Sequence, residues 1–433
     1  MKYLFGWVLG ALASVMMTGV AQAQDRQIIL VGNLIPDAET GPVGPATIVV
    51  VDGKITEIVR QRDIVQEGIA MALEADTAID LSDKTVMPGL IDLHVHLTGD
   101  PGGDYWKRAT EPAEWGVVVG AKNAWVTARA GFTTVREAGS SQYSAFSLRR
   151  GTAEGLIPGP RIIAAGPPLA IVGGHGDTTG FTEPVNELLA SGYSCTGAVE
   201  CAENVRKASR AGSDLIKITA TGGVLSQQGR GLEAHFTDAE MRSIADTAHS
   251  LGLKVMAHAH GARGIEAAAR AGIDTIDHAT FADDAALRVM KANGTVMVPT
   301  LMAFKGVSEG LGKGIYTPVV EAKIRKTLGS VGKAVTAAKK MGVPVAFGTD
   351  AGVFPHGRNA EELQLMVNAG LTNREALASA TTIAADTLDM GDEIGRIAVG
   401  YSADLIAFDG NPLDDVRVLE KIDWVMVRGR IID

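Results

Sequence analysis

The sequence is poor in cysteine, in aromatic residues and in basic charge, and these shortages exclude several classes of protein. Only two of its 433 residues are cysteines, which excludes a disulfide framework and a zinc site made of two cysteine pairs. Aromatic residues make up 5%, too few for an extended stacking surface. The net charge is −10 and no basic stretch is present, so we expect no nucleic-acid partner.

Long hydrophobic runs are also absent, except at the N-terminus. Lys2 precedes a mostly apolar stretch, residues 3–20, and Ala21-Gln22-Ala23 has the small-x-small pattern of a cleavage site. We predict a signal peptide over residues 1–23, export to the periplasm or the exterior, and no membrane association after cleavage. An uncleaved membrane anchor is the alternative.

The two cysteines, Cys195 and Cys201, lie six residues apart. Export would place them in an oxidising compartment, where a local disulfide can form. Two free buried thiols are the other interpretation.

The middle of the chain alternates short apolar runs with alanine-rich amphipathic stretches such as residues 238–251 and 264–271. Such alternation predicts a parallel sheet, and eight repeats predict a closed (β/α)8 TIM barrel over residues 88–390. A doubly wound open sheet is the alternative, but no Gly-x-Gly-x-x-Gly turn follows an early strand. The eight runs are residues 91–97, 133–136, 161–165, 215–220, 254–258, 275–278, 295–299 and 344–349.

Both ends of the chain carry short β-type runs. Asp52-Gly53 stands between two such runs, which is a strong hairpin signal. Further runs follow residue 403. We therefore predict an α/β protein in which residues 24–87 and 391–433 build one small β-sandwich domain, with the barrel inserted between them.

Ionisable residues gather at the ends of the predicted barrel strands, where catalytic residues of such barrels lie. Alternate residues of a strand face the same side, so a His-x-His pair can direct both rings at one ion. Burying this many polar groups without a metal would leave them unpaired. The candidate residues are His94, His96, Lys217, His258, His278 and Asp350.

Four imidazoles and a carboxylate suit Zn²⁺, with Mn²⁺, Co²⁺ or Fe²⁺ as alternatives. Lys217 is the unusual member, because cations beside it would lower its pKa. A neutral amine can react with CO₂ to give a carbamate, and that anion could bridge two divalent metal ions. An unmodified Lys217 paired with an acid is the simpler interpretation.

Several of these motifs resemble the amidohydrolase superfamily. They are Met-Pro-Gly-Leu-Ile-Asp-Leu-His-Val-His at residues 87–96, Thr-Gly-Gly at 221–223, the His258/His278 pair, Gly-Thr-Asp at 348–350 and Gly-Tyr-Ser-Ala-Asp-Leu at 400–405. Residues 133–136 and 173–177 are similar to its branch of imidazolonepropionases and Xaa-Pro dipeptidases.

The resemblance implies a role for each site residue. His94 and His96 would bind the first metal with Asp350, which would also be the general base. Lys217, as N6-carboxylysine, would bridge both metals. His258 and His278 would bind the second; His260 shares the strand parity of His258 and is the alternative to it.

Other expected roles lie in the loops. The resemblance implies that His175 polarises the substrate carbonyl or contacts the substrate, against a purely structural loop histidine. His356 has a weaker case: it lies in the loop after Asp350 and could line the cleft. One departure from the family is Glu137, where relatives commonly carry Asp, and we assign it no role. The candidates for substrate binding are Arg136, Arg230, Arg358 and Tyr105.

The expected activity is metal-assisted hydrolysis of dipeptides or N-acyl amino acids, including ochratoxin-type amides, with release of a C-terminal amino acid. The alternatives are a cyclic-amide hydrolase or deaminase of the same superfamily and, more remotely, a periplasmic metal-binding protein. The resemblance also implies a small-molecule substrate and a homo-oligomer.

Overall fold

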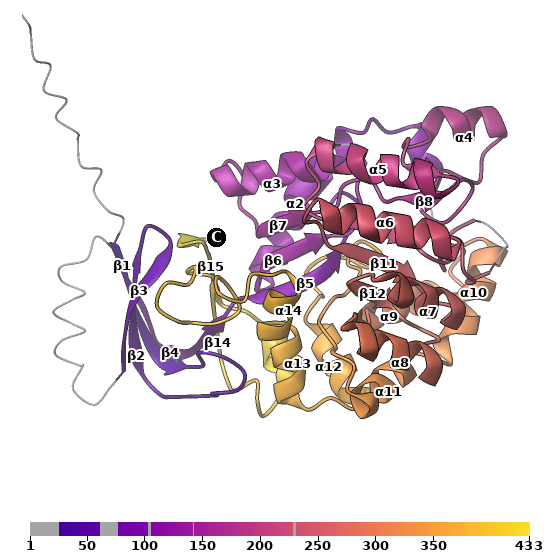
Figure 1. The fold of residues 1–433 in the computed structure, drawn as a ribbon. Coiled ribbons are helices and arrows are strands. Elements are labelled where there is room, and N and C mark those ends of the chain that lie inside the picture. Colours follow the sequence, from indigo (N-terminus) through magenta and orange to yellow (C-terminus); the bar gives the residue numbers. More distant parts are fainter. Residues whose placement is uncertain (1–25, 61–76, 103–104, 142, 228–230) are drawn as a thin grey trace, which may run out of the picture.

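A computed structural model describes residues 26–60, 77–102, 105–141, 143–227 and 231–433 (Figure 1). The predicted signal peptide and Arg230 lie outside these ranges. Within them, no helix is both long enough and apolar enough to cross a membrane.

The two ends of the chain build one seven-stranded sheet, which lies beside the barrel in Figure 1. Its order is β16-β15-β14-β4-β1-β2-β3, so strands from both termini are interleaved in the predicted β-domain. Where we predicted a sandwich, the described strands form a single hydrogen-bonded sheet. Asp52 and Gly53 both have positive φ, as a two-residue hairpin requires. The strands are β1 (Arg26–Leu34), β2 (Ala46–Val51), β3 (Lys54–Arg60), β4 (Thr77–Pro88), β14 (Leu405–Phe408), β15 (Trp424–Val427) and β16 (Arg430–Ile431).

The central region is a closed parallel barrel, as predicted. Two sheets, β5-β6-β7 and β10-β11-β12-β13, supply seven strands, and residues 344–349 supply the eighth. Asp214 N donates to Ala164 O at 2.9 Å between the two sheets, and Leu93 N donates to Phe347 O at 3.0 Å where the ring closes. The strands are β5 (Leu90–Val95), β6 (Phe132–Glu137), β7 (Arg161–Ala164), β10 (Ile216–Thr219), β11 (Val255–Ala259), β12 (Thr275–His278) and β13 (Val296–Val298). This closure rules out the open sheet.

Helices cover the outside of the barrel (Figure 1). The two amphipathic stretches that we expected to be helical correspond to α6 and α7, and α6 begins with a capping box between Thr237 and Glu240. The helices are α2 (Trp115–Arg129), α3 (Ser144–Glu154), α4 (Glu183–Leu189), α5 (Ala198–Ala211), α6 (Asp238–Ser250), α7 (Ala262–Ala271), α8 (Asp284–Asn293), α9 (Leu301–Glu309), α10 (Pro318–Leu328), α11 (Lys333–Met341), α12 (Glu361–Asn368), α13 (Asn373–Ser379) and α14 (Thr382–Thr387), with the 3₁₀ turns η1 (Tyr105–Ala109) and η2 (Val416–Glu420).

The two cysteines are joined. Cys195, in the short strand β9 (Ser194–Cys195) that pairs with β8 (Ala170–Ile171), forms a disulfide with Cys201 on α5. The disulfide ties the start of α5 to the long loop after β7.

Candidate metal centre

The carboxyl ends of the barrel strands carry unusual backbone conformations. His278, Thr300 and Asp350 all have positive φ, which is costly for residues other than glycine. Such strain collects where a fold must direct side chains in a particular way. At His278 it redirects the chain at the strand end, so Asp277 and His278 can both contribute side chains to the barrel mouth although successive strand residues normally face opposite sides.

His94, His96 and Asp350 form the first of two clusters, which we call the first cluster. Asp350 Oδ1 lies 3.4 Å from His94 Nε2 and 3.3 Å from His96 Nε2. This oxygen is buried and has no hydrogen-bond partner among the described residues. Three potential ligand atoms therefore converge on one point.

The hydrogen bonds of the two rings fix which nitrogens are free. His94 Nδ1 donates to Asp277 Oδ2 at 2.7 Å, and His96 Nδ1 donates to the carbonyl of Gly139 at 3.0 Å, because both partners can only accept. The Nε2 atoms of the neutral rings are then bare acceptors that face a carboxylate. Burial lowers the pKa of His96, but the Asp350 carboxylate raises it by more, so the pKa lies above its usual value. The carboxylate thus attracts positive charge, a proton or a metal ion, to this point.

Asp277 is a residue that the sequence reasoning missed. It is fully buried, accepts from His94, and also accepts from Arg136 Nη2 at 3.2 Å. Arg136, expected to hold a substrate carboxylate, is itself buried and donates to Leu93 O and Thr275 Oγ1. It therefore supports Asp277 inside the barrel rather than a substrate. The missed signal was an acid directly before His278 at a strand end.

Lys217 on β10 lies beside the first cluster. Its Nζ is 3.5 Å from His94 Nε2 and 3.8 Å from Asp277 Oδ2. Burial lowers the pKa of the Lys217 ammonium, while Asp277 and Asp350 raise it, and the net shift is downward. Burial is the largest cause that lowers the pKa of His278, and the charge of Lys217 is one of the smaller ones. Lys217 thus presents a buried amine, with a lowered pKa, beside His94.

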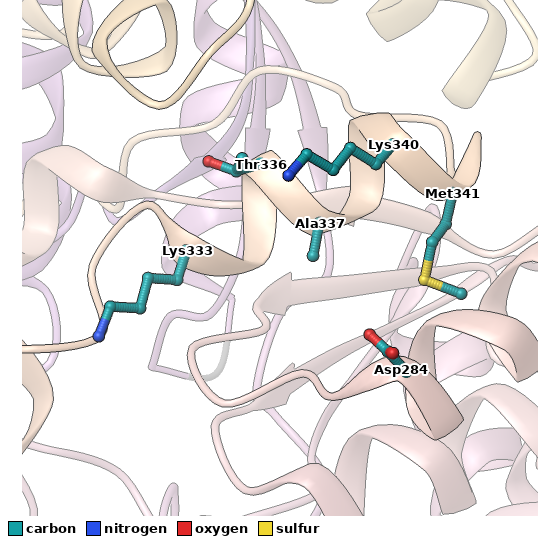
Figure 2. Close-up of a pocket in the computed structure, with 6 residues that line it drawn as sticks. All are labelled: Asp284, Lys333, Thr336, Ala337, Lys340 and Met341. Atoms are coloured by element: carbon teal, nitrogen blue, oxygen red, sulfur yellow. The ribbon is translucent and has the colours of Figure 1, made fainter.

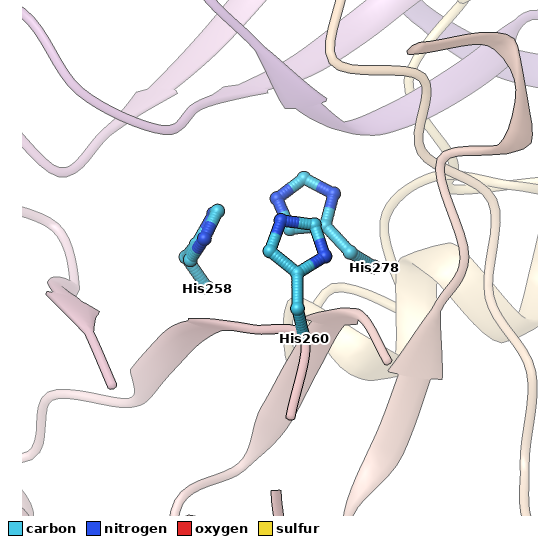
Figure 3. A group of neighbouring side chains, drawn as sticks. All are labelled: His258, His260 and His278. Carbon is cyan, nitrogen blue, oxygen red and sulfur yellow. The ribbon is translucent and has the colours of Figure 1, made fainter. Parts of the chain in front are cut away.

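His258, His260 and His278 form the second cluster, which Figure 3 shows as three rings close together. Ring centroids are 4.5 Å apart for His258 and His278, and 4.9 Å apart for His260 and His278. The ring of His94 lies 5.1 Å from that of His278, so the two clusters are adjacent. Burial lowers the pKa of all three rings of the second cluster, which keeps them neutral.

The hydrogen-bond partners of the second cluster restrict the ring tautomers less than those of the first cluster do. His258 Nε2 donates to the carbonyl of Gly222 at 3.3 Å, which leaves Nδ1 as its acceptor. His278 Nδ1 pairs with Thr300 Oγ1 at 2.6 Å and His260 Nδ1 with Thr280 Oγ1 at 2.7 Å. A hydroxyl can donate or accept, so these two tautomers are adjustable. Geometry alone does not choose between His258 and His260 as a ligand.

His175 joins the second cluster from the loop after β8. Its ring centroid lies 4.2 Å from that of His258, and its Nδ1 pairs with Ser226 Oγ at 2.6 Å. Burial holds the pKa of His175 well below its usual value. The structure thus places a neutral imidazole beside the candidate ligands.

Asp92 is a second residue that the sequence reasoning left without a role, although it stands in the motif at 87–96. Its carboxylate accepts from the backbone N of His94 at 3.0 Å, from Thr349 Oγ1 at 2.6 Å and from Asn359 Nδ2 at 2.8 Å. Burial raises its pKa to about 6. Asp92 therefore ties β5 to the eighth strand and aligns His94 with Asp350.

The remaining predicted residues are placed less favourably for binding. Arg358 pairs with Glu309 and Glu361, so its charge is already balanced. His356 is buried and bridges Thr127 Oγ1 and His96 O, so it supports the backbone of a candidate ligand.

Tyr105 alone of the described substrate-binding candidates lies at an open position. Its side chain is 39% exposed, and its ring packs at 5.5 Å against Phe181, six residues after His175 in the same loop. Arg230 lies in a part of the chain that the structure does not describe.

A surface hollow of about 550 Å³ lies elsewhere, between α8 and α11 (Figure 2). Its lining residues offer two lysines and one aspartate but no histidine: Asp284, Lys333, Thr336, Ala337, Lys340 and Met341. It has none of the convergence seen at the strand ends.

The donor set at the strand ends fits divalent cations. Its imidazoles are each hydrogen-bonded on one nitrogen, which is the usual arrangement of histidine ligands. The buried oxygen of Asp350 lacks the partner that such a cation would supply. The residues that could hold such ions are His94, His96 and Asp350 in the first cluster and His258, His260 and His278 in the second.

Comparison with known proteins shows the family to which the chain belongs. Residues 85–432 match the amidohydrolase family. The ochratoxinase of Aspergillus niger is 33% identical over 420 residues, which is 91% of this chain and 83% of that protein. A crystal structure of a Xaa-Pro dipeptidase with bound methionine in the active site is 34% identical, with a TM-score of 0.83 over 94% of this chain and 99% of the other. The crystal structure of A. niger ochratoxinase has a TM-score of 0.81 at 29% identity, over 94% of this chain and 95% of the other. The chain thus belongs to the amidohydrolase family, and with it to the hydrolases that act on amide bonds.

Proposed function

We propose that this protein is a binuclear metal-dependent hydrolase that cleaves dipeptides or N-acyl amino acids and releases the C-terminal amino acid. The observation that carries the proposal is the pair of adjacent clusters, with the buried amine of Lys217 next to His94, the residue of the first cluster that lies beside His278. A single-metal hydrolase would not need a buried amine at this point.

His94, His96 and Asp350 would hold one ion, His258 and His278 the other, and carboxylated Lys217 would bridge them. Bound divalent ions, most suitably Zn²⁺, would lower the pKa of a water and polarise the scissile carbonyl. Asp350 would accept the proton of the attacking water and pass it to the leaving nitrogen. His175 would donate a hydrogen bond to the oxygen that gains charge.

The substrate class comes from the relatives, one named for ochratoxin and others for Xaa-Pro dipeptides. Both names suit an amide whose leaving group is an amino acid. A free α-carboxylate needs a cation that is not already paired. Arg136 and Arg358 both have acidic partners, so Arg230 remains the candidate of the three.

The test is turnover of a panel of dipeptides and N-acyl amino acids by protein stripped of metal and by protein reloaded with Zn²⁺. We expect activity only after reloading, and we expect amidation of the substrate C-terminus to lower kcat/KM at least about tenfold. Equal cleavage of amidated and free-acid substrates would overturn the proposed substrate class. Turnover of cyclic amides alone would instead support the imidazolonepropionase-like alternative, which matches 182 residues at 34% identity.

The proposal includes export of the chain after cleavage behind Ala23. N-terminal sequencing of the protein from a periplasmic or extracellular fraction would test it, with Gln24 expected as the first residue.

A further inference from the structure

Lys323 is a buried lysine that the proposed function leaves without a role. It lies on α10, its side chain is buried, and its ammonium donates to two backbone carbonyls, Gly223 O at 2.8 Å and Ser226 O at 2.6 Å. Burial lowers its pKa to about 8. Burying a cation costs desolvation free energy. The loop that Lys323 contacts is therefore a place to look for a function.

The loop held by Lys323 leads directly to His175. Ser226, whose carbonyl accepts from Lys323, pairs through its Oγ with His175 Nδ1 at 2.6 Å. Gly223, the other acceptor, packs so closely on the His175 ring that a Cβ there would overlap it. A second contact from the N-terminal end of α10 supports the same loop, because Thr317 Oγ1 donates to Gln227 Oε1 at 2.9 Å.

We propose that Lys323 is a positioning residue for His175 and acts through Gly223 and Ser226. The inference rests on the proposed function, which places His175 at the substrate carbonyl. When the Ser226 hydroxyl donates to Nδ1, the ring keeps its proton on Nε2, the nitrogen that can then donate to the carbonyl. By fixing the carbonyls of Gly223 and Ser226, Lys323 fixes the distance between that hydroxyl and the ring.

The first test is kinetic and uses Lys323→Met, Ser226→Ala and the double variant. Each single change should lower kcat at least about tenfold, because the carbonyl donor is misplaced, with a smaller change in KM. The double variant should lose little more than either single one, since both act through one loop. Lys323→Arg should restore part of the lost kcat. Lys326→Met, an exposed lysine three residues along the same helix, is the matched control and should leave kcat unchanged.

The second test reports on the ring without any turnover. Histidine ¹⁵N chemical shifts separate protonated from bare ring nitrogens, and a His175→Gln spectrum identifies His175 among the nine histidines. Wild type should show a bare Nδ1 and a protonated Nε2, and both Lys323→Met and Ser226→Ala should show a mixture of tautomers. This result stands even if no dipeptide is cleaved, so it separates this inference from the proposed function.

Unchanged His175 shifts in Lys323→Met, together with kcat within about twofold of wild type, would overturn the inference. If Lys323→Met does not fold, Ser226→Ala decides alone. Unchanged His175 shifts and an unchanged kcat in Ser226→Ala would then overturn the inference.

Discussion

The two histidine clusters differ in what holds their rings. In the first cluster, each Nδ1 donates to a group that can only accept, the Asp277 carboxylate or the Gly139 carbonyl. In the second cluster, His260 and His278 pair with threonine hydroxyls, which can reverse their hydrogen bonds. The first cluster is therefore fixed in advance for a cation, whereas the second can adjust. In the proposed function, this fixed geometry lies where Asp350 would also accept a proton.

The largest expected effect comes from the one group that would serve as both ligand and base. Asp350→Asn can still coordinate through its oxygen but cannot accept a proton at neutral pH. We expect kcat to fall on the order of 10²–10⁴-fold, with the fold and the metal content retained. Steady-state kinetics, thermal melting and metal analysis would check this. Near wild-type kcat with full metal would mean that the base is another residue.

The second prediction removes the residue that joins the clusters. Lys217→Ala should lose most of the metal and most of the activity, because no bridging anion would remain. Short carboxylates added to the buffer should restore part of both by occupying the vacated position. Metal content and kcat, measured with and without added formate or acetate, would check this; full metal occupancy without any carboxylate would contradict the bridge.

The third prediction separates His258 from His260 inside the adjustable cluster. His258→Asn should lose one metal ion per chain. Its activity should fall by more than roughly 10–100-fold, which is the loss expected when a hydrogen-bond partner of a ligand, rather than the ligand itself, is removed. His260→Asn should keep both metals. Metal content per chain decides between them, and the opposite pattern would make His260 the ligand.

The fourth prediction tests the charged partner of the first cluster. Asp277→Asn should lower metal affinity or activity roughly 10–100-fold, because His94 would lose the acceptor that sets its tautomer. His249→Gln provides the control, because His249 also pairs with an aspartate, Asp274, at 2.9 Å, but at the surface. Titration with Zn²⁺ would measure both variants. Equal Zn²⁺ affinities of Asp277→Asn and wild type would show that Asp277 does not support metal binding.

The smallest effect concerns the scaffold outside both clusters. Burial raises the pKa of Glu362 from 4.5 to about 8, although it accepts from the backbone N of Leu301 and Met302. The folded protein therefore keeps a proton that the unfolded chain releases between these values, and this contribution to stability decreases as pH rises from about 5 to 8. In Glu362→Gln this part of the dependence should vanish. The difference in Tm between variant and wild type, measured across that range, would check it; a constant difference would contradict it.

Much of the site could be predicted from the sequence, because alternate residues of a strand face the same side. His94 on β5 and His96, one residue past its end, lie two apart and face one ion position. The same rule did not separate His258 from His260, and both lie in the second cluster of the structure. The barrel was predictable because eight runs alternate with helical segments. The interleaving of β4 between β1 and β14 was not, since it depends on pairing between distant parts of the chain.

The sequence failed where a side chain's partner is distant along the chain. Arg136 looked available for a substrate, but Asp277, 141 residues further on, takes its charge inside the barrel. The contact between Ser226 and His175 joins two loops, and no local pattern predicts it. Positive φ at His278 let two successive residues serve the site, which strand alternation alone would not allow.

The most direct test of the central claim is the metal-to-chain ratio of fully active protein. Elemental analysis of the purified chain, titrated with Zn²⁺ until kcat stops rising, would give this ratio. We predict two ions per chain, with activity that is complete only when both sites are filled. A ratio of one ion per chain at full activity would contradict the binuclear site and the bridging role of Lys217.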